Sequence, residues 1–160
     1  MTSHKECKIL PYTADEMFAL VGDIERYPEF LPWCTRLKIR ERREEGGQTV
    51  LVADMRISFK IVSESFTSKV ALDPASRRID VTYVNGPFRY LHNRWQFEPR
   101  PEGGCAVDFF IDFEFRSRAL GMLIGAVFHV AIEKLVAAFE ARARVLYRPA
   151  YPNAIAPRPV

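Results

Sequence analysis

Residues 109–128 read FFIDFEFRSRALGMLIGAVF, and this stretch decides the fold because its periodicity changes in the middle. In the first half, apolar residues alternate with Asp112 and Glu114, which predicts a strand with one apolar and one polar face. From about Ser117 the apolar residues follow helical spacing, which continues to about Tyr147 and stops before Pro149. A helix of that length spans roughly 45 Å. It is the only predicted element long enough to cover the apolar face of a sheet.

Strands of the same kind precede this one. In VLVADMRISFKI, residues 50–61, apolar residues from Leu51 to Ile61 share one face of the strand, and charged or polar residues share the other. Short turn signals such as Asn85-Gly86-Pro87 separate these runs, and short turns connect antiparallel neighbours. We expect about six strands between residues 36 and 115, after a first strand near residues 5–12.

Two short helical segments follow the first strand. Thr13 or Asp15 can cap a helix that ends near Val21, and residues 27–34, YPEFLPWC, form a second, broken turn. The predicted fold class is therefore α+β. It is a curved antiparallel sheet of about seven strands wrapped around a long C-terminal helix, with two short helices after strand one.

The composition indicates a globular protein. The 160 residues are 48% hydrophobic and 27% charged, and we expect one domain over residues 1–147 and a disordered, proline-rich tail over residues 148–160. The net charge is +3, and most of the 23 basic residues are arginine, which fits either scattered solvated charge or contacts with phosphate or RNA. The three cysteines lack metal-site spacing and are expected to be reduced thiols in the cytosol.

The sequence predicts no membrane span and no secretory signal. The first ten residues contain no apolar core of a signal peptide. The longest apolar run, residues 119–132, is shorter than the ~18 residues of a membrane span. A soluble, cytoplasmic protein is expected.

Catalytic signatures are largely missing. The sequence has no phosphate-binding loop, no GxSxG and no HExxH, and its three histidines are too scattered to predict a metal site. We therefore expect no enzyme, no metal and no required cofactor. Two residues stay open: Glu64 lies either at a strand end near water or in a cavity, and His129 either is a core or surface histidine or contacts a ligand.

The role of two small features also stays open. Gly121 and Gly125 weaken the long helix by roughly 1 kcal/mol each relative to alanine, so they serve either close packing or the making of room. Residues 27–34 place Phe30, Leu31 and Trp33 where they either pack the end of the core or gate an apolar pocket. We refer to residues 27–34 as the lid segment.

Three motifs in order resemble those of a known family. YPEFLPWC (27–34), GPFRYLHNRWQFEP (86–99) and FFIDFEFRSRALGMLIGAVF (109–128) are similar to motifs of the coenzyme Q-binding START-like family. This family belongs to the polyketide cyclase and START superfamily and has a branch of bacterial ribosome association toxins. The resemblance covers residues 3–147. It implies a helix-grip (START/Bet v 1-like) fold with an apolar cavity between sheet and long helix. It also implies a non-catalytic carrier or chaperone for coenzyme Q (ubiquinone) in respiratory electron transport.

The same resemblance implies the ligand-binding residues. Matched by motif, they are Phe30, Leu31, Pro32, Trp33, Phe88, Tyr90, Leu91, Trp95, Phe128 and Leu135. The inner parity of neighbouring strands adds Met55, Ile57, Phe59 and Tyr83. In a regular strand Tyr90 and Leu91 point to opposite faces, so at most one of them faces the cavity.

Two other functions compete with lipid binding. In the toxin branch, an RNA-facing surface would bind the large ribosomal subunit through Arg40, Arg42, Arg43, Arg77, Arg78, Arg142, Arg144 and Arg148. An aromatase or cyclase is the third hypothesis, because fold alone does not define function. The expected partners are a prenyl-quinone or other lipid, transient contact with the inner membrane of a bacterium, and the large ribosomal subunit in the alternative case. No DNA is expected.

Overall fold

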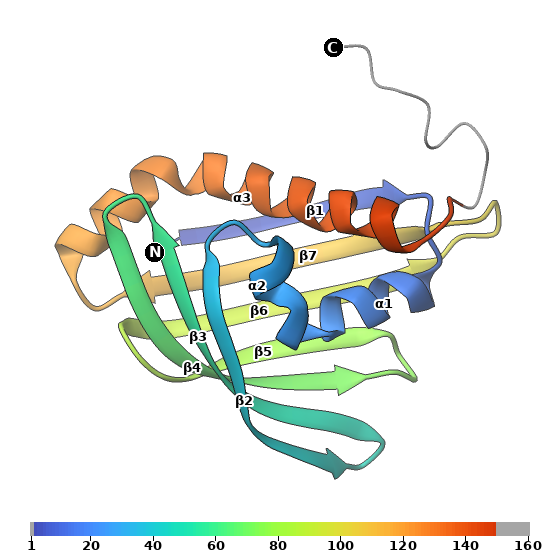
Figure 1. Cartoon of the computed structure of the whole chain (residues 1–160), viewed down its shortest axis with the longest axis horizontal. Helices are drawn as coiled ribbons and strands as arrows, with labels where there is room; N and C mark the ends of the chain where they lie inside the picture. The colour runs from blue at the N-terminus through green and yellow to red at the C-terminus, as the bar shows by residue number, and fades with distance from the viewer. Residues whose placement is uncertain (1, 150–160) are drawn as a thin grey trace.

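A single antiparallel sheet curves around the helices in the computed structural model, which describes residues 2–149 (Figure 1). The strands are β1 (Thr2–Leu10), β2 (Cys34–Glu45), β3 (Gln48–Phe59), β4 (Val62–Asp73), β5 (Arg78–Asn85), β6 (Phe88–Pro99) and β7 (Cys105–Phe115). The helices are α1 (Ala14–Gly22), the 3₁₀ turn η1 (Ile24–Arg26), α2 (Tyr27–Phe30) and α3 (Arg118–Leu146). This order confirms the predicted helix-grip fold.

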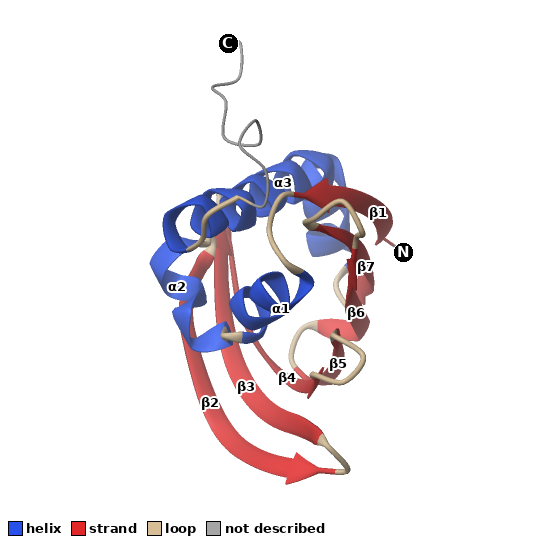
Figure 2. Ribbon diagram, turned by 90° about the vertical axis from the view of Figure 1, so that its right-hand side faces the viewer, coloured by secondary structure: helices blue, strands red, loops and turns tan. Residues whose placement is uncertain are grey.

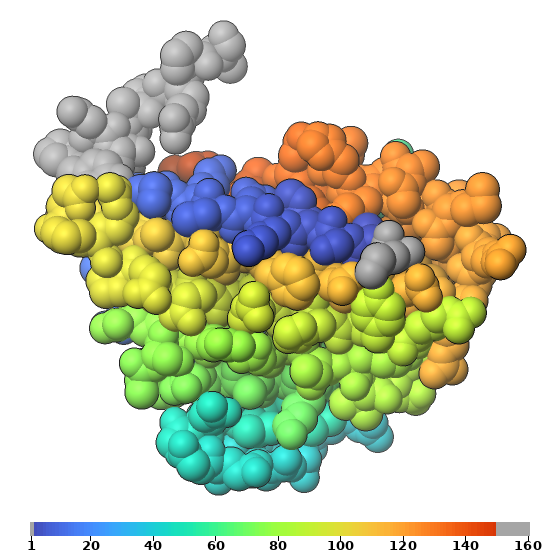
Figure 3. Space-filling model, turned by 180° about the vertical axis from the view of Figure 1, so that it is seen from behind, coloured from blue at the N-terminus to red at the C-terminus, as the bar shows by residue number. Residues whose placement is uncertain are grey.

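The sheet is a meander closed by the first strand. Its order is β1-β7-β6-β5-β4-β3-β2, and every pair is antiparallel. Figure 2 shows the sheet bending round α1 and α2, with α3 lying across the open side. Seen from behind, β1 runs along the sheet edge beside α3 (Figure 3). The concave face of the sheet is therefore the one that the helices cover.

Side-chain caps set the starts of the two longer helices. Thr13 Oγ1 accepts from the Glu16 N–H at 3.0 Å, and the Glu16 carboxylate accepts from the Thr13 N–H at 2.9 Å, which completes a capping box. Thr13, not Asp15, is thus the cap of α1. Ser117 Oγ accepts from the Leu120 N–H at 3.2 Å and starts α3 directly after β7.

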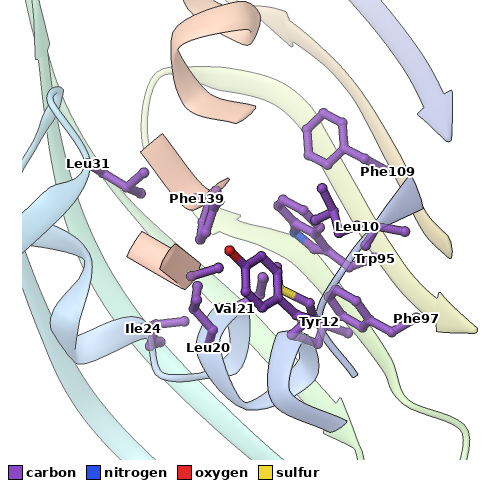
Figure 4. Packing of buried hydrophobic residues seen from close by; sticks show 14 of the residues in the cluster. Leu10, Tyr12, Leu20, Val21, Ile24, Leu31, Trp95, Phe97, Phe109 and Phe139 are labelled. Atoms are coloured by element: carbon purple, nitrogen blue, oxygen red, sulfur yellow. The ribbon is translucent and has the colours of Figure 1, made fainter. Parts of the chain in front are cut away.

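The core is concentrated at one end of α3. Its fully buried residues, Ile132, Phe139 and Ala143, all lie in its C-terminal half. Phe139 meets Trp95 of β6 with ring centroids 5.2 Å apart, and Figure 4 shows these rings gathered with Phe97 in the main cluster. The N-terminal half of α3 instead exposes large apolar side chains such as Met122, which is 78% exposed.

Helix α3 bears on the expectation that the chain has no membrane span. Within residues 2–149 it is the one helix long and apolar enough, by length and composition, to cross a membrane. Its uncharged run, residues 119–132, is shorter than a span, and the helix reaches that length only when charged residues such as Glu133 and Lys134 are included. Here the helix lies on the sheet.

The remaining differences are local. Ile61 continues the apolar parity of β3 in the sequence, but it lies in the turn after Phe59 and is 86% exposed. Gly86, at φ 144°, places its backbone so close to Phe66 that a Cβ would lie 2.6 Å from the Phe66 Cβ. The expected tail, residues 148–160, falls outside the described residues from position 150 on.

Candidate functional site

The concave side of the sheet encloses an apolar cavity of about 180 Å³, which we call the inner cavity. It lies between the sheet, the lid segment and the C-terminal half of α3. Its walls are Ile24, Tyr27, Leu31, Trp33, Cys34, Leu37, Ala53, Met55, Ile57, Phe66, Ser68, Val70, Ile79, Val81, Leu91, Asn93, Trp95, Phe109, Ile111, Leu135 and Phe139.

A second cavity of about 220 Å³, the outer cavity, continues toward the N-terminal half of α3. Its walls are Trp33, Ile57, Phe59, Phe66, Phe88, Leu91, Ile111, Phe113, Phe115, Ile124, Val127 and Ala131. Neither cavity alone reaches the ~300 Å³ at the lower end for drug-sized ligands. Because Trp33, Ile57 and Leu91 border both, the two spaces adjoin at these side chains.

Three polar side chains line the inner cavity besides the cysteine. Asn93 Nδ2 donates to the Phe110 carbonyl at 2.8 Å, and Asn93 Oδ1 accepts from Trp95 Nε1 at 3.0 Å. The Tyr27 hydroxyl donates to the Val21 carbonyl. Ser68 is 4% exposed, and its hydroxyl has no hydrogen-bond partner among residues 2–149. It is therefore available to a bound molecule.

The titratable groups of the inner cavity are uncharged at neutral pH. Burial raises the pKa of the Cys34 thiol to about 11, and burial also raises the pKa of Tyr27. Among residues 2–149, no carboxylate, histidine, lysine or arginine borders the inner or the outer cavity. Within the described chain, no group of three or more His, Cys, Asp or Glu residues could hold a metal ion. A neutral, largely apolar ligand suits these walls.

The lid segment contributes in two ways. Leu31 and Trp33 line the inner cavity, and the Trp33 ring lies 5.4 Å from the Phe59 ring of β3. Phe30 instead packs against Phe139 at 5.4 Å, beneath the Arg142 guanidinium. Pro32 is exposed. Part of this segment therefore packs the end of the core, and part forms a cavity wall.

The predicted strand and helix residues divide between the two cavities. Met55, Trp95 and Leu135 line the inner one, Phe59 and Phe88 line the outer one, and Ile57 and Leu91 line both. Tyr83 borders neither cavity but packs beside Phe88, whose N–H donates to the Tyr83 hydroxyl at 3.1 Å. Phe128 packs on Phe113 at 5.4 Å and borders neither cavity.

Tyr90 needs a correction. The register between β6 and β7 shifts between Phe88 and Tyr90, so Phe88 pairs with Phe115 while Tyr90 pairs with Glu114. The Tyr90 hydroxyl donates to Asp112 on the outer face, at 3.3 Å. Because of this irregularity, Phe88 and Leu91 both face inward although they are three residues apart. A regular alternation would have placed them on opposite faces.

The structure also adds wall residues that sequence reasoning did not select. They include Tyr27, Leu37, Ser68, Asn93, Phe109 and Phe139. Asn93 shares the parity of Leu91 and Trp95, and a polar residue in that position was the available signal. The others look like ordinary core residues in the sequence.

The open features now have positions. A Cβ added at Gly121 or Gly125 would meet no atom within 4 Å, so these glycines do not serve close packing. His129 is a surface residue, because its side chain is 86% exposed and Nε2 lies 2.8 Å from Glu133 Oε1. Glu64 is half-buried and lines neither cavity.

A curved sheet that grips a long helix over a neutral apolar cavity defines the class of helix-grip proteins. Residues 10–140 match the family described as polyketide cyclase/dehydrase and lipid transport, and the chain belongs to this family.

Relatives within it carry different names. The chain is 41% identical over 147 residues to the ribosome association toxin RatA of Rickettsia prowazekii. The aligned part covers 90% of this chain and 97% of the relative. It is 29% identical to a mitochondrial coenzyme Q-binding protein, COQ10 homolog B of Xenopus laevis, over 90% of this chain and 59% of the relative. Among solved structures, the 18 kDa protein CC1736 from Caulobacter crescentus is 39% identical, with a TM-score of 0.77 and 91% and 98% coverage of the two chains.

Proposed function

We propose that the protein binds a neutral lipid of the prenyl-quinone class, coenzyme Q (ubiquinone) in particular, and acts as a non-catalytic carrier or chaperone for respiration. The observation that carries this proposal is the uncharged apolar cavity with one unpartnered hydroxyl, that of Ser68. A quinone ring offers carbonyl acceptors to that donor, and an isoprenoid tail offers apolar surface to the walls. The name of the COQ10 relative supports the same ligand class.

The energetics favour occupation by an apolar molecule. A ligand that fills the inner cavity of about 180 Å³ gains free energy through burial of its own apolar surface, at roughly 25 cal/mol per Å². Few polar contacts are needed.

The absence of catalysis is part of the proposal. General acid–base chemistry needs a group whose pKa lies near the working pH. Burial moves the pKa values of Cys34 and Tyr27 upward, away from neutrality, so neither is suited to that role. No cofactor is required for a carrier of this kind, which would work in the cytoplasm and exchange its lipid at the inner membrane.

Fluorescence titration tests this proposal directly. Both tryptophans of the chain, Trp33 and Trp95, line the inner cavity, so a short-chain, water-soluble quinone should quench their emission saturably. Removal of a hydrogen bond in Ser68→Ala should weaken binding about two- to tenfold, corresponding to about 0.5–1.5 kcal/mol. Ser65→Ala is the matched control, because Ser65 lies on the outer face of the same strand and accepts from Arg56 at 3.0 Å.

Organic extraction of the protein purified from its native host supplies the second readout. A co-purified quinone identified by mass spectrometry is the expected result. Protein that carries no lipid and also leaves its tryptophan emission unchanged on addition of quinone would refute the proposal.

Ribosome association is the second candidate, favoured by the name of the 41% identical relative. Five of the eight arginines expected to contact RNA already lie within 4 Å of a carboxylate, which reduces the positive charge available to bind phosphate. They are Arg40, Arg43, Arg77, Arg78 and Arg142. Sedimentation with the large ribosomal subunit at low salt, and release at high salt, would support this function.

A further inference from the structure

An apolar groove lies open at the end of the molecule remote from the buried half of α3. It runs between the β3–β4 hairpin and the first half of α3, has a volume of about 660 Å³, and we call it the end groove. Its walls are Phe59, Lys60, Ile61, Val62, Ala119, Met122, Leu123, Ile124, Ala126 and Val127. Figure 1 shows the hairpin beside the start of α3, and Figure 3 shows that start at one end of the molecule.

Several large apolar side chains of the groove are highly exposed to solvent. Ile61 is 86% exposed, Met122 78% and Leu123 42%. Scattered apolar residues are normal on a protein surface, but a contiguous patch indicates an interaction site. Here the patch is continuous from hairpin to helix.

The end groove also adjoins the outer cavity. Phe59, Ile124 and Val127 are walls of both, so the groove and the outer cavity meet at these three side chains. The first half of α3 has no fully buried residue, and Gly121 and Gly125 lower its helix stability by roughly 1 kcal/mol each. This part of the helix is therefore less deeply buried than the second half, and its contacts with the sheet include Phe128 on Phe113.

Cationic side chains lie on and beside the groove. Lys60 is one of its walls, and Arg116 and Arg118 line a neighbouring surface pocket, whose one carboxylate among the described residues, Glu114, lies 3.3 Å from Arg89. Arg116 Nε donates to the Phe88 carbonyl at 3.0 Å, which holds its guanidinium beside the outer cavity. Within residues 2–149, Lys60 and Arg118 form no ion pair. An apolar patch with a cationic border matches the surface of an anionic bilayer.

We infer that the end groove and its three cations dock on an anionic lipid bilayer, and that the neutral cargo passes between bilayer and outer cavity beside Phe59. The route for the cargo rests on the proposed function, whereas the docking surface rests on exposure and charge alone. A second copy of the chain is a poorer occupant. A symmetric dimer through this face would bring two sets of the same three cations together.

Vesicle flotation of the full chain tests the docking surface. The wild type should float with phosphatidylcholine vesicles that contain phosphatidylglycerol, and float less without the anionic lipid or at high salt. Met122→Glu places a charge in the groove and should reduce the bound fraction at least tenfold. Val145→Glu is the matched control, because Val145 is 76% exposed near the other end of the same helix, and it should float like the wild type.

A second variant tests the charge contribution. Arg118→Glu should weaken binding to the anionic vesicles more than fivefold, because each basic residue near such a surface contributes about a factor of five. It should leave the weaker binding to phosphatidylcholine alone nearly unchanged. Thermal melting of each variant checks that it remains folded.

Quinone titration without vesicles separates this inference from the proposed function. Met122→Glu should still show tryptophan quenching by a short-chain quinone, because Met122 lines neither cavity. If the wild type floats but shows no quenching, docking stands and the proposed cargo fails. Flotation of Met122→Glu equal to wild type, no flotation of the wild type, or a wild-type dimer that Met122→Glu dissociates would overturn docking at this groove.

Discussion

Substitution of Ala53 by leucine tests two properties of the inner cavity: whether it can hold additional side-chain atoms, and whether the ligand binds in it. Ala53 is 2% exposed on β3 and borders the inner cavity of about 180 Å³. Three added carbon atoms that enter empty space contribute up to about 2 kcal/mol at ~0.8 kcal/mol each. The ligand-free protein should therefore become more stable, although the change is from a small to a large buried side chain.

Thermal denaturation measures the first effect. For a chain of this length about 1 kcal/mol corresponds to roughly 2–4 °C, so the melting temperature should rise by about 4–8 °C. Ala143→Leu is the matched control. Ala143 is fully buried on α3 and borders neither cavity, so the same change should destabilise the protein by about 1–3 kcal/mol through overpacking.

Quinone titration measures the second effect. The leucine side chain occupies the volume that the ligand needs, so Ala53→Leu should weaken quenching of Trp95 at least tenfold, which equals about 1.4 kcal/mol. A variant as unstable as Ala143→Leu would show that the space is not available. A stabilised variant with unchanged quinone affinity would show that the ligand does not use the inner cavity.

Three further predictions concern stability. Phe139→Ala should lower the free energy of unfolding in urea by about 3–5 kcal/mol, because the ring is 4% exposed and packs on Tyr27 and Trp95; a loss below 1 kcal/mol would contradict the packing described. Gly121→Ala should raise the free energy of unfolding by about 0.8–1.0 kcal/mol, since the added Cβ meets no atom within 4 Å, and a decrease would show a hidden clash. The pKa of Cys34 is raised by burial from 9.0 to about 11, so the unfolded chain loses this proton first and stability falls as pH rises from 9 to 11. In Cys34→Ala the free energy of unfolding, measured by chemical denaturation at each pH, should fall less steeply, by up to about 1.4 kcal/mol per pH unit. An equal slope in the variant and the wild type would refute the raised pKa of Cys34.

Much of the fold follows from local rules that act within a short stretch of chain. Alternation in residues 109–115 and helical spacing after Ser117 predict β7 and α3, and the capping pattern at Thr13 predicts the start of α1. Short turns require antiparallel neighbours, so the order from β2 to β7 also follows, whereas the pairing of β1 with β7 does not. These features depend on neighbours in sequence, which is why they can be recognised there.

The cavity residues follow from sequence only where the strands are regular. Met55, Ile57 and Trp95 lie on the inner face that their parity predicts. The parity rule fails between Phe88 and Leu91, because an irregularity in the β6–β7 pairing turns the two residues between them outward. Such a register shift depends on a partner strand and leaves no periodic signal in the chain.

The sequence by itself determined the helix-grip order of elements, the apolar inner parity and the lack of a catalytic motif, because each depends on residue type and spacing. Only the tertiary structure decided which inner residues leave space between them, that the Ser68 hydroxyl lacks a partner within residues 2–149, and that Phe59, Ile124 and Val127 border both a surface groove and the outer cavity. Empty volume and unmet hydrogen bonds arise between side chains from distant segments. They exist only after those segments have packed together.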